Sequence, residues 1–234
     1  KKTKKTKKTK KTKKTKKTKK TKKMKQQVVV GSRVLYAGQH LNKNIWGDIV
    51  KDTFTWVKSE EKPLVLNGHV RTVDAVCFSP DGKLVASCSG DQTVRICSVV
   101  DGSLVHELKG HSGFVLSLSY SPNGKLVASA SNDGTVRICR VSDGMLVQEL
   151  NGHSGYHVCV HCVCFSPDGK LVASGAGDKT VRICRVSDGM LVQELEGHRG
   201  WVMGVCFSPD GELVASASAD KTVRICRVSD GMLV

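Results

Sequence analysis

The sequence predicts an all-β fold, a β-propeller built from repeated four-stranded sheets. The main support is an internal repeat, because four near-copies of one unit occupy residues 67–234. Each copy opens with Gly-His, and the four histidines follow one another at intervals of 42, 42 and 45 residues. Each copy then repeats Ser-Pro-(Asp/Asn)-Gly, Leu-Val-Ala-Ser, an Asp and Thr-Val-Arg-Ile-Cys in the same order. A fixed period in the low forties is typical of four-stranded propeller blades.

Within one copy, apolar residues alternate with a period of two in four short segments. In the second copy these segments are residues 115–120, 125–131, 135–141 and 145–150, each rich in Val, Ile or Leu. Turn-forming residues separate them at 121–124, 132–134 and 142–144. Each copy is therefore predicted to form four antiparallel strands, which make one blade.

The chain divides into three parts. Residues 1–26 form a Lys/Thr low-complexity tail, which we expect to be disordered because a long block of like charges repels itself. Residues 27–66 are either a linker or a degenerate blade, since 53–59 can be aligned with 135–141. The repeats occupy 67–108, 109–150, 151–195 and 196–234. Because the chain begins with Lys and stops within a repeat, we expect it to be a fragment of a longer protein.

The positive charge belongs to the tail. The net charge is +16, but residues 1–23 hold 16 of the 37 basic residues, which leaves 21 basic and 21 acidic residues elsewhere. The tail could therefore bind nucleic acid or another polyanion, although it has no aromatic residue for base stacking. No run of 18 apolar residues is present, so we expect no membrane partner.

Cysteines recur at fixed places in the repeats. Regular placement within strands indicates small buried hydrophobic residues rather than a disulfide framework. Free thiols fit a reducing compartment, so we expect an intracellular protein, in the cytoplasm or the nucleus. Seven of the ten cysteines hold such positions: Cys77, Cys164 and Cys206 before Phe-Ser-Pro, and Cys97, Cys139, Cys184 and Cys226 after Arg-Ile.

Over residues 67–234 the repeated motifs resemble those of the WD40 family. The resemblance implies that a His, a Ser and an Asp in each blade form a hydrogen-bonded set that locks it. It also implies a fourth member, a Trp, but Cys97, Cys139, Cys184 and Cys226 stand in its place, which predicts looser blades. The blade-locking residues would be His69, Ser87, Asp91, His111, Ser129, Asp133, His153, Ser174, Asp178, His198, Ser216 and Asp220.

The resemblance further implies a non-catalytic scaffold that binds a protein or peptide and needs no cofactor. The copies differ from one another mainly after Gly-His and beside the Asp, which indicates where a partner would bind. Exposed aromatics near Arg are typical of interface hot spots, but the same aromatics could instead fix the first strand in the blade core. The candidate partner-binding residues are Arg71, Phe114, Tyr156, Lys179, Arg199, Trp201 and Lys221.

The sequence also contains residues of the types found in zinc sites and in catalytic triads. Residues 156–164 contain His157, Cys159, His161, Cys162 and Cys164, which could suggest zinc, but their spacing matches no standard pair, so we expect a structural insertion and no metal. The Ser, His and Asp of each copy could suggest a catalytic triad. Since an active site needs one set and the chain has four, we expect no catalytic residue and no enzyme.

Two alternative functions stay open at this point. The tail could tether a nucleic-acid-associated factor. Very similar consecutive repeats also resemble those of NTPase–WD40 fusion proteins, in which the propeller is a sensor part.

Overall fold

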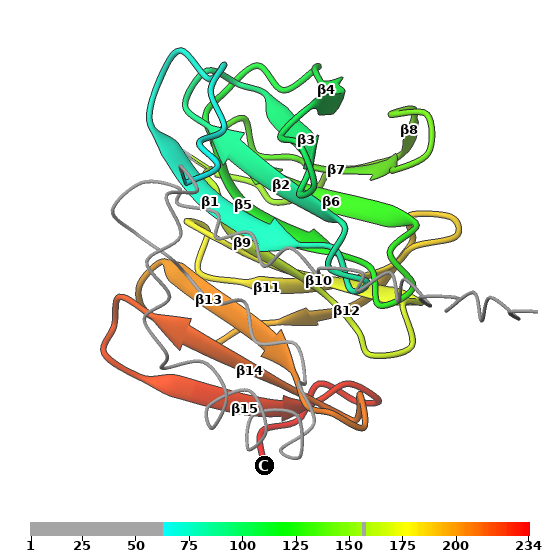
Figure 1. The fold of residues 1–234 in the computed structure, drawn as a ribbon. Helices are drawn as coiled ribbons and strands as arrows, with labels where there is room; N and C mark the ends of the chain where they lie inside the picture. The colour runs from blue at the N-terminus through cyan, green and yellow to red at the C-terminus, as the bar shows by residue number, and fades with distance from the viewer. Residues whose placement is uncertain (1–62, 156–157) are drawn as a thin grey trace, which may run out of the picture.

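The computed structural model describes residues 63–155 and 158–234, and its regular structure there is β-strand throughout (Figure 1). Side chains alternate between the two faces of each strand, and in the second strand of the inner sheets both faces are buried between neighbouring sheets, as at residues 126–131 and 171–176. The strands are β1 (Val73–Phe78), β2 (Leu84–Ser89), β3 (Val94–Ser98), β4 (Leu104–Leu108), β5 (Val115–Tyr120), β6 (Leu126–Ser131), β7 (Val136–Arg140), β8 (Leu146–Leu150), β9 (Val160–Phe165), β10 (Leu171–Ala176), β11 (Val181–Arg185), β12 (Leu191–Leu195), β13 (Val202–Phe207), β14 (Leu213–Ser218) and β15 (Val223–Arg227).

The strands form four antiparallel sheets in chain order. β1–β4, β5–β8 and β9–β12 are four-stranded, and β13–β15 is a three-stranded sheet to which Leu233 adds one bridge with Cys226. The first strands contact one another in the order β1, β5, β9 and β13, so that the sheets follow one another as propeller blades (Figure 1). The predicted all-β propeller architecture is confirmed.

The strand boundaries follow the sequence pattern closely. In the second blade, residues 115–120 form β5 as predicted, and the other three predicted segments are each shortened by one or two end residues. The proposed degenerate blade or linker at 27–66 lies almost wholly outside the described residues, and the Lys/Thr tail lies entirely outside them. Within the described ranges, no helix is long and apolar enough to cross a membrane.

The hydrophobic core lies between blades. At each junction, the Ala, Val and Ile side chains of one blade meet the Val, aromatic and Cys side chains of the next, as where Ile96 and Val94 cluster with Tyr120 and Cys139. The same layers recur between the second and third blades and between the third and fourth.

The last blade leaves one of these faces uncovered. Ile225 is 44% exposed, whereas its counterparts Ile96, Ile138 and Ile183 are fully buried. Cys206 is exposed on the same sheet, so the prediction of burial is wrong for this residue. Its counterparts Cys77 and Cys164 are only partly buried, and Cys97, Cys139, Cys184 and Cys226 are buried as predicted.

Every first strand contains a β-bulge near its start. The pairing register skips one residue in each, and these residues are Asp74, Leu116, His161 and Met203. A bulge bends the strand and redirects the extra side chain. Four different residue types therefore occupy equivalent positions at the same end of the four blades.

Candidate functional site

Each blade contains the same hydrogen-bonded set of His, Ser and Asp. In the first blade, His69 Nδ1 lies 2.9 Å from Asp91 Oδ2, and His69 Nε2 lies 2.9 Å from Ser87 Oγ. The structure brings the remaining predicted residues together in the same way, at 2.8–2.9 Å: His111 with Ser129 and Asp133, His153 with Ser174 and Asp178, and His198 with Ser216 and Asp220.

The direction of these bonds follows from their chemistry. An ionised Asp only accepts hydrogen bonds, so His Nδ1 must carry a proton, and in the neutral ring Nε2 then accepts the proton of the Ser hydroxyl. This is also the order of a Ser–His–Asp triad. However, Ser129, Ser174 and Ser216 are only 4–5% exposed, so a substrate has little access to these hydroxyls.

Each Asp has its acceptor positions filled. In the fourth blade, Asp220 Oδ2 accepts from His198 Nδ1 at 2.9 Å and from the Arg199 backbone N at 2.8 Å, while Oδ1 accepts from the Thr222 N at 2.9 Å and its hydroxyl at 2.6 Å. In the third blade, burial opposes ionisation of Asp178, but hydrogen bonds from His153 and Thr180 outweigh it and lower the pKa of Asp178 to about 2. These carboxylates are therefore charged at neutral pH.

An Arg–Glu pair beside the Gly-His of each of the first three blades was not predicted from the sequence. Arg95 Nη1 donates to the Gly68 carbonyl at 3.0 Å and to Glu107 at 2.7 Å. A Cβ on Gly68 would lie 2.6 Å from the Arg95 guanidinium, and Gly68 has a φ of +126°, so glycine is needed there. The available signal was the constant spacing of 12 residues between Arg and Glu, seen again in Arg137–Glu149 and Arg182–Glu194.

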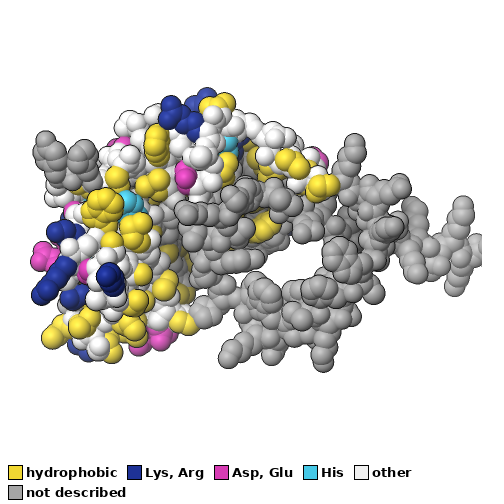
Figure 2. Space-filling view, turned by 90° about the vertical axis from the view of Figure 1, so that its left-hand side faces the viewer, with side chains coloured by type: hydrophobic (Ala, Val, Ile, Leu, Met, Phe, Trp, Pro, Cys, Tyr) yellow, Lys and Arg dark blue, Asp and Glu magenta, His cyan; other side chains and the backbone are white. Residues whose placement is uncertain are grey.

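The connections that carry Gly-His and the turns that carry the Asp lie at one end of the blades. We call this end the loop face, formed by residues 68–72, 110–114, 152–155, 158–159 and 197–201 with the turns at 90–92, 132–134, 177–179 and 219–221. The β14–β15 turn is at the left of Figure 1, and Figure 2 looks at the molecule from that side. Figure 2 shows Lys and Arg side chains beside hydrophobic ones on this face.

Variable side chains join one blade to the next across the loop face. Arg71 lies over the Phe114 ring, with its guanidinium carbon 5.6 Å from the ring centroid. His161 stacks on Trp201 with ring centroids 5.7 Å apart. Between them, the Cys159 thiol donates a hydrogen bond to Asn132. The side chains that differ between copies thus form a continuous belt across all four blades.

The described partner candidates are all exposed there. Phe114 is 42% and Trp201 is 54% exposed, so neither is fixed in a blade core. Both stand directly before a first strand. The other exposed candidates are Arg71, Lys179, Arg199 and Lys221. Tyr156 lies outside the described residues.

The structure identifies a member of this belt that sequence reasoning missed. The residue directly before each first strand accepts a backbone hydrogen bond from the turn: Asn132 N bonds Phe114 O, and Ala219 N bonds Trp201 O. In the third blade, Gly177 N bonds Cys159 O at 2.9 Å. Cys159 therefore occupies the place of Phe114 and Trp201.

The cysteine- and histidine-rich stretch is divided between different surroundings. Cys162 is buried at the junction with the fourth blade and Cys164 packs against the same cluster, whereas His161 lies in the bulge against Trp201. His157 lies outside the described residues. Among residues 63–155 and 158–234, no group of three or more His, Cys, Asp or Glu side chains could hold a metal ion.

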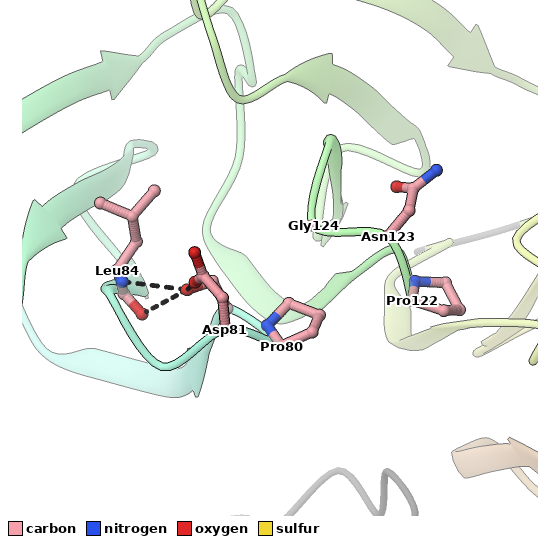
Figure 3. Close-up of a pocket in the computed structure, with 7 residues that line it drawn as sticks. Pro80, Asp81, Leu84, Pro122, Asn123 and Gly124 are labelled. Carbon is pink, nitrogen blue, oxygen red and sulfur yellow. Dashed lines mark hydrogen bonds between the residues drawn. The ribbon is translucent and has the colours of Figure 1, made fainter.

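A hollow lies at the opposite end, between the first two blades (Figure 3). It is lined by two copies of the Ser-Pro-(Asp/Asn)-Gly turn, from Ser79 to Asp81 with Leu84, and from Pro122 to Gly124. Ser79 Oγ donates to Asp81 at 2.7 Å and accepts from the Leu84 N at 2.9 Å. Asn123 Oδ1 likewise accepts from Ser121 Oγ and the Lys125 N, so these polar groups already hold the turns themselves.

Comparison with known proteins agrees with this architecture. The family model described as "WD domain, G-beta repeat" matches residues 61–98, 102–139, 144–184 and 189–226, and the matches end within β3, β7, β11 and β15. "WD repeat-containing protein SL1-17" of Schistosoma mansoni is 50% identical over 40 residues, which is 17% of this chain and 13% of that protein. "Pre-mRNA-processing factor 19" of Bos taurus is 39% identical over 69 residues, 29% of this chain and 14% of that protein.

Proposed function

Because the chain belongs to the WD40 repeat family, whose members are in general non-catalytic scaffolds that bind proteins, we propose that its loop face binds a partner protein or peptide. One observation carries the proposal. The copies share most of their strand residues but differ in the connections and turns of the loop face, where Phe114 and Trp201 stay exposed. A large aromatic side chain left in water beside an Arg is the composition of a binding hot spot.

The His–Ser–Asp sets are proposed to keep this face rigid. Each set links the Gly-His connection to strand and turn of the same blade, as His198 does with Ser216 and Asp220. A preformed surface loses less conformational entropy when a partner binds. The residues that vary are thus held on a constant frame.

The cellular location is part of the same proposal. All ten cysteines of the chain are free, and several are buried. Unpaired thiols in a protein fit a reducing compartment. We therefore place the protein inside the cell, in the cytoplasm or the nucleus.

Alanine substitution with quantitative partner capture tests the proposal. The full chain is immobilised, partners are captured from cells that produce it, and the yield is compared for wild type, Phe114→Ala and Trp201→Ala. Hot-spot truncation typically costs at least about 2 kcal/mol, so the yield should fall by about tenfold or more. Met190→Ala is the matched control, because Met190 is 61% exposed but lies in the β11–β12 turn at the opposite end.

Thermal melting separates a binding role from a packing role. Trp201 is 54% exposed, so its removal should shift the melting temperature by only a few degrees. A Trp201→Ala chain that melts much earlier but captures its partners normally would contradict the proposal.

A further inference from the structure

Three turns of the loop face hold a side chain in a backbone conformation that favours glycine. The φ angles of Gln92, Lys179 and Lys221 are +73°, +73° and +71°. For a residue with a Cβ, the left-handed region costs roughly 1–2 kcal/mol. The second blade has Gly134 in the same place, with a φ of +86°.

The fold itself does not require these lysines. Gly134 N donates to Ser131 O at 3.2 Å, and Lys179 N and Lys221 N make the equivalent bonds at 3.2 and 3.1 Å. The glycine turn and the lysine turns therefore have the same hydrogen bonding. Residues kept in strained conformations cluster at functional sites, which suggests that the ammonium groups serve a purpose at this surface.

The charges that a partner can reach on the loop face are mainly positive. Lys179 and Lys221 are exposed on the turns, and Arg71 and Arg199 are exposed on the connections. The exposed acidic residues at the edge of this face are Glu196 and two that pair with Arg, Glu149 with Arg137 and Glu194 with Arg182. The cations and the exposed Phe114 and Trp201 rings thus occupy one surface.

The acidic groups beneath them cannot serve a basic partner. The side chains of Asp91, Asp133, Asp178 and Asp220 are only 7–12% exposed. Each carboxylate already accepts from a His ring, a Thr hydroxyl and two backbone N–H groups, as Asp220 does. A partner's Lys or Arg would find no free acceptor on these four carboxylates, whereas a partner's carboxylate can reach the exposed cations.

We propose that the loop face binds an acidic peptide segment, whose carboxylates pair with Lys179, Lys221 and Arg199 while an apolar side chain packs on Trp201. This inference rests on the proposed function and adds the chemistry of the partner. A nucleic-acid partner is less favoured, because outside residues 1–23 the chain has 21 basic and 21 acidic residues and therefore no net positive charge.

Glycine substitution offers a sharp test, because glycine should relieve the strain and remove the charge together. The double variant Lys179→Gly/Lys221→Gly should raise the urea midpoint of unfolding. The same variant should bind a synthetic Glu/Leu peptide about three- to tenfold more weakly, as expected for the loss of two exposed ion pairs. Gln92→Gly is the matched control, since it relieves equal strain without removing a charge, and it should leave peptide affinity unchanged.

The probes are the Glu/Leu peptide, versions with Gln or Lys in place of Glu, and a single-stranded oligonucleotide, each titrated against the full chain. The Gln and Lys peptides should bind more weakly to the loop face. Carbodiimide, which joins carboxylates to neighbouring amines, should link the Glu/Leu peptide to Lys179 and Lys221, and mass spectrometry should locate the links. This readout separates the loop face from the tail.

Several results would overturn the inference. These are unchanged affinity of the double glycine variant, an equal loss in Gln92→Gly, cross-links confined to residues 1–23, or displacement of the peptide from Lys179 and Lys221 by the oligonucleotide. Each would leave the proposed function standing, because partner capture by Phe114→Ala and Trp201→Ala chains tests that separately.

Discussion

The uncovered face of the last blade allows one substitution to be compared in two environments. Ile138 and Ile225 both lie in Thr-Val-Arg-Ile-Cys, on β7 and β15. Ile138 is fully buried between two blades, and Ile225 is 44% exposed. Replacing each with Ala removes the same atoms from the same local sequence, so the difference between the two variants measures burial between blades.

The expected magnitudes follow from this burial. Ile→Ala removes about three carbon groups at about 0.8 kcal/mol each, or roughly 2.4 kcal/mol of transfer free energy. Ile138→Ala also leaves a cavity, so its total loss should be about 3–4 kcal/mol. At Ile225 roughly half of the transfer term applies and no closed cavity forms, so the loss should be about 1 kcal/mol.

Urea unfolding followed by circular dichroism measures both losses, with tryptophan fluorescence as a check that the transition is cooperative. Equal losses of stability, within about 0.5 kcal/mol, would refute the view that packing between blades dominates the stability of the repeat array.

Three further predictions concern other parts of the molecule. Because the pKa of Asp178 is lowered to about 2, its contribution to stability should be complete above pH ~4 and should be lost as the pH falls towards 2; Asp178→Asn should flatten stability-versus-pH curves in that window. Gly110→Ala should lower the free energy of unfolding, measured in denaturant titrations, more than Gly82→Ala does. Gly110 has a φ of +121° and an added Cβ would lie 2.6 Å from Arg137, whereas Gly82 has a φ of +68° and open space around it. Equal losses of stability in the two variants would contradict this. Polyanion binding should fall steeply with salt and disappear when residues 1–23 are deleted, which filter binding at several salt concentrations can measure; affinity retained by residues 24–234 would disprove it.

The strands and their boundaries could be predicted from the sequence because they depend on local periodicity and turn chemistry. Residues 115–120 form β5 because alternation and a following Pro-Asn-Gly turn determine a strand and its end. His198, Ser216 and Asp220 could be paired because the repeated motifs resemble those of the WD40 family, and that resemblance implies a His–Ser–Asp set in each blade.

Side-chain pairs and exposures that depend on strand register or on a neighbouring blade could not be predicted from the sequence. The Arg95–Glu107 pair requires the register between two strands. The role of Cys159 was hidden because the third copy has three additional residues before its first strand. The exposure of Cys206 depends on which surface covers its sheet, and no local motif carries that information.

The serial order of the blades has a consequence for the way the chain opens. The main contacts between described sheets join consecutive blades, from β1 to β5, β9 and β13. In such an array, stability is approximately a sum of unit terms and nearest-neighbour terms. The amides of β7 and β15 lie in the same five-residue sequence, Val-Arg-Ile-Cys-Arg. They should nevertheless exchange with solvent deuterium at very different rates. The blade of β7 has a junction with a described blade on each side, and both must separate before β7 is released. The blade of β15 has one such junction, so β15 can open when that junction separates.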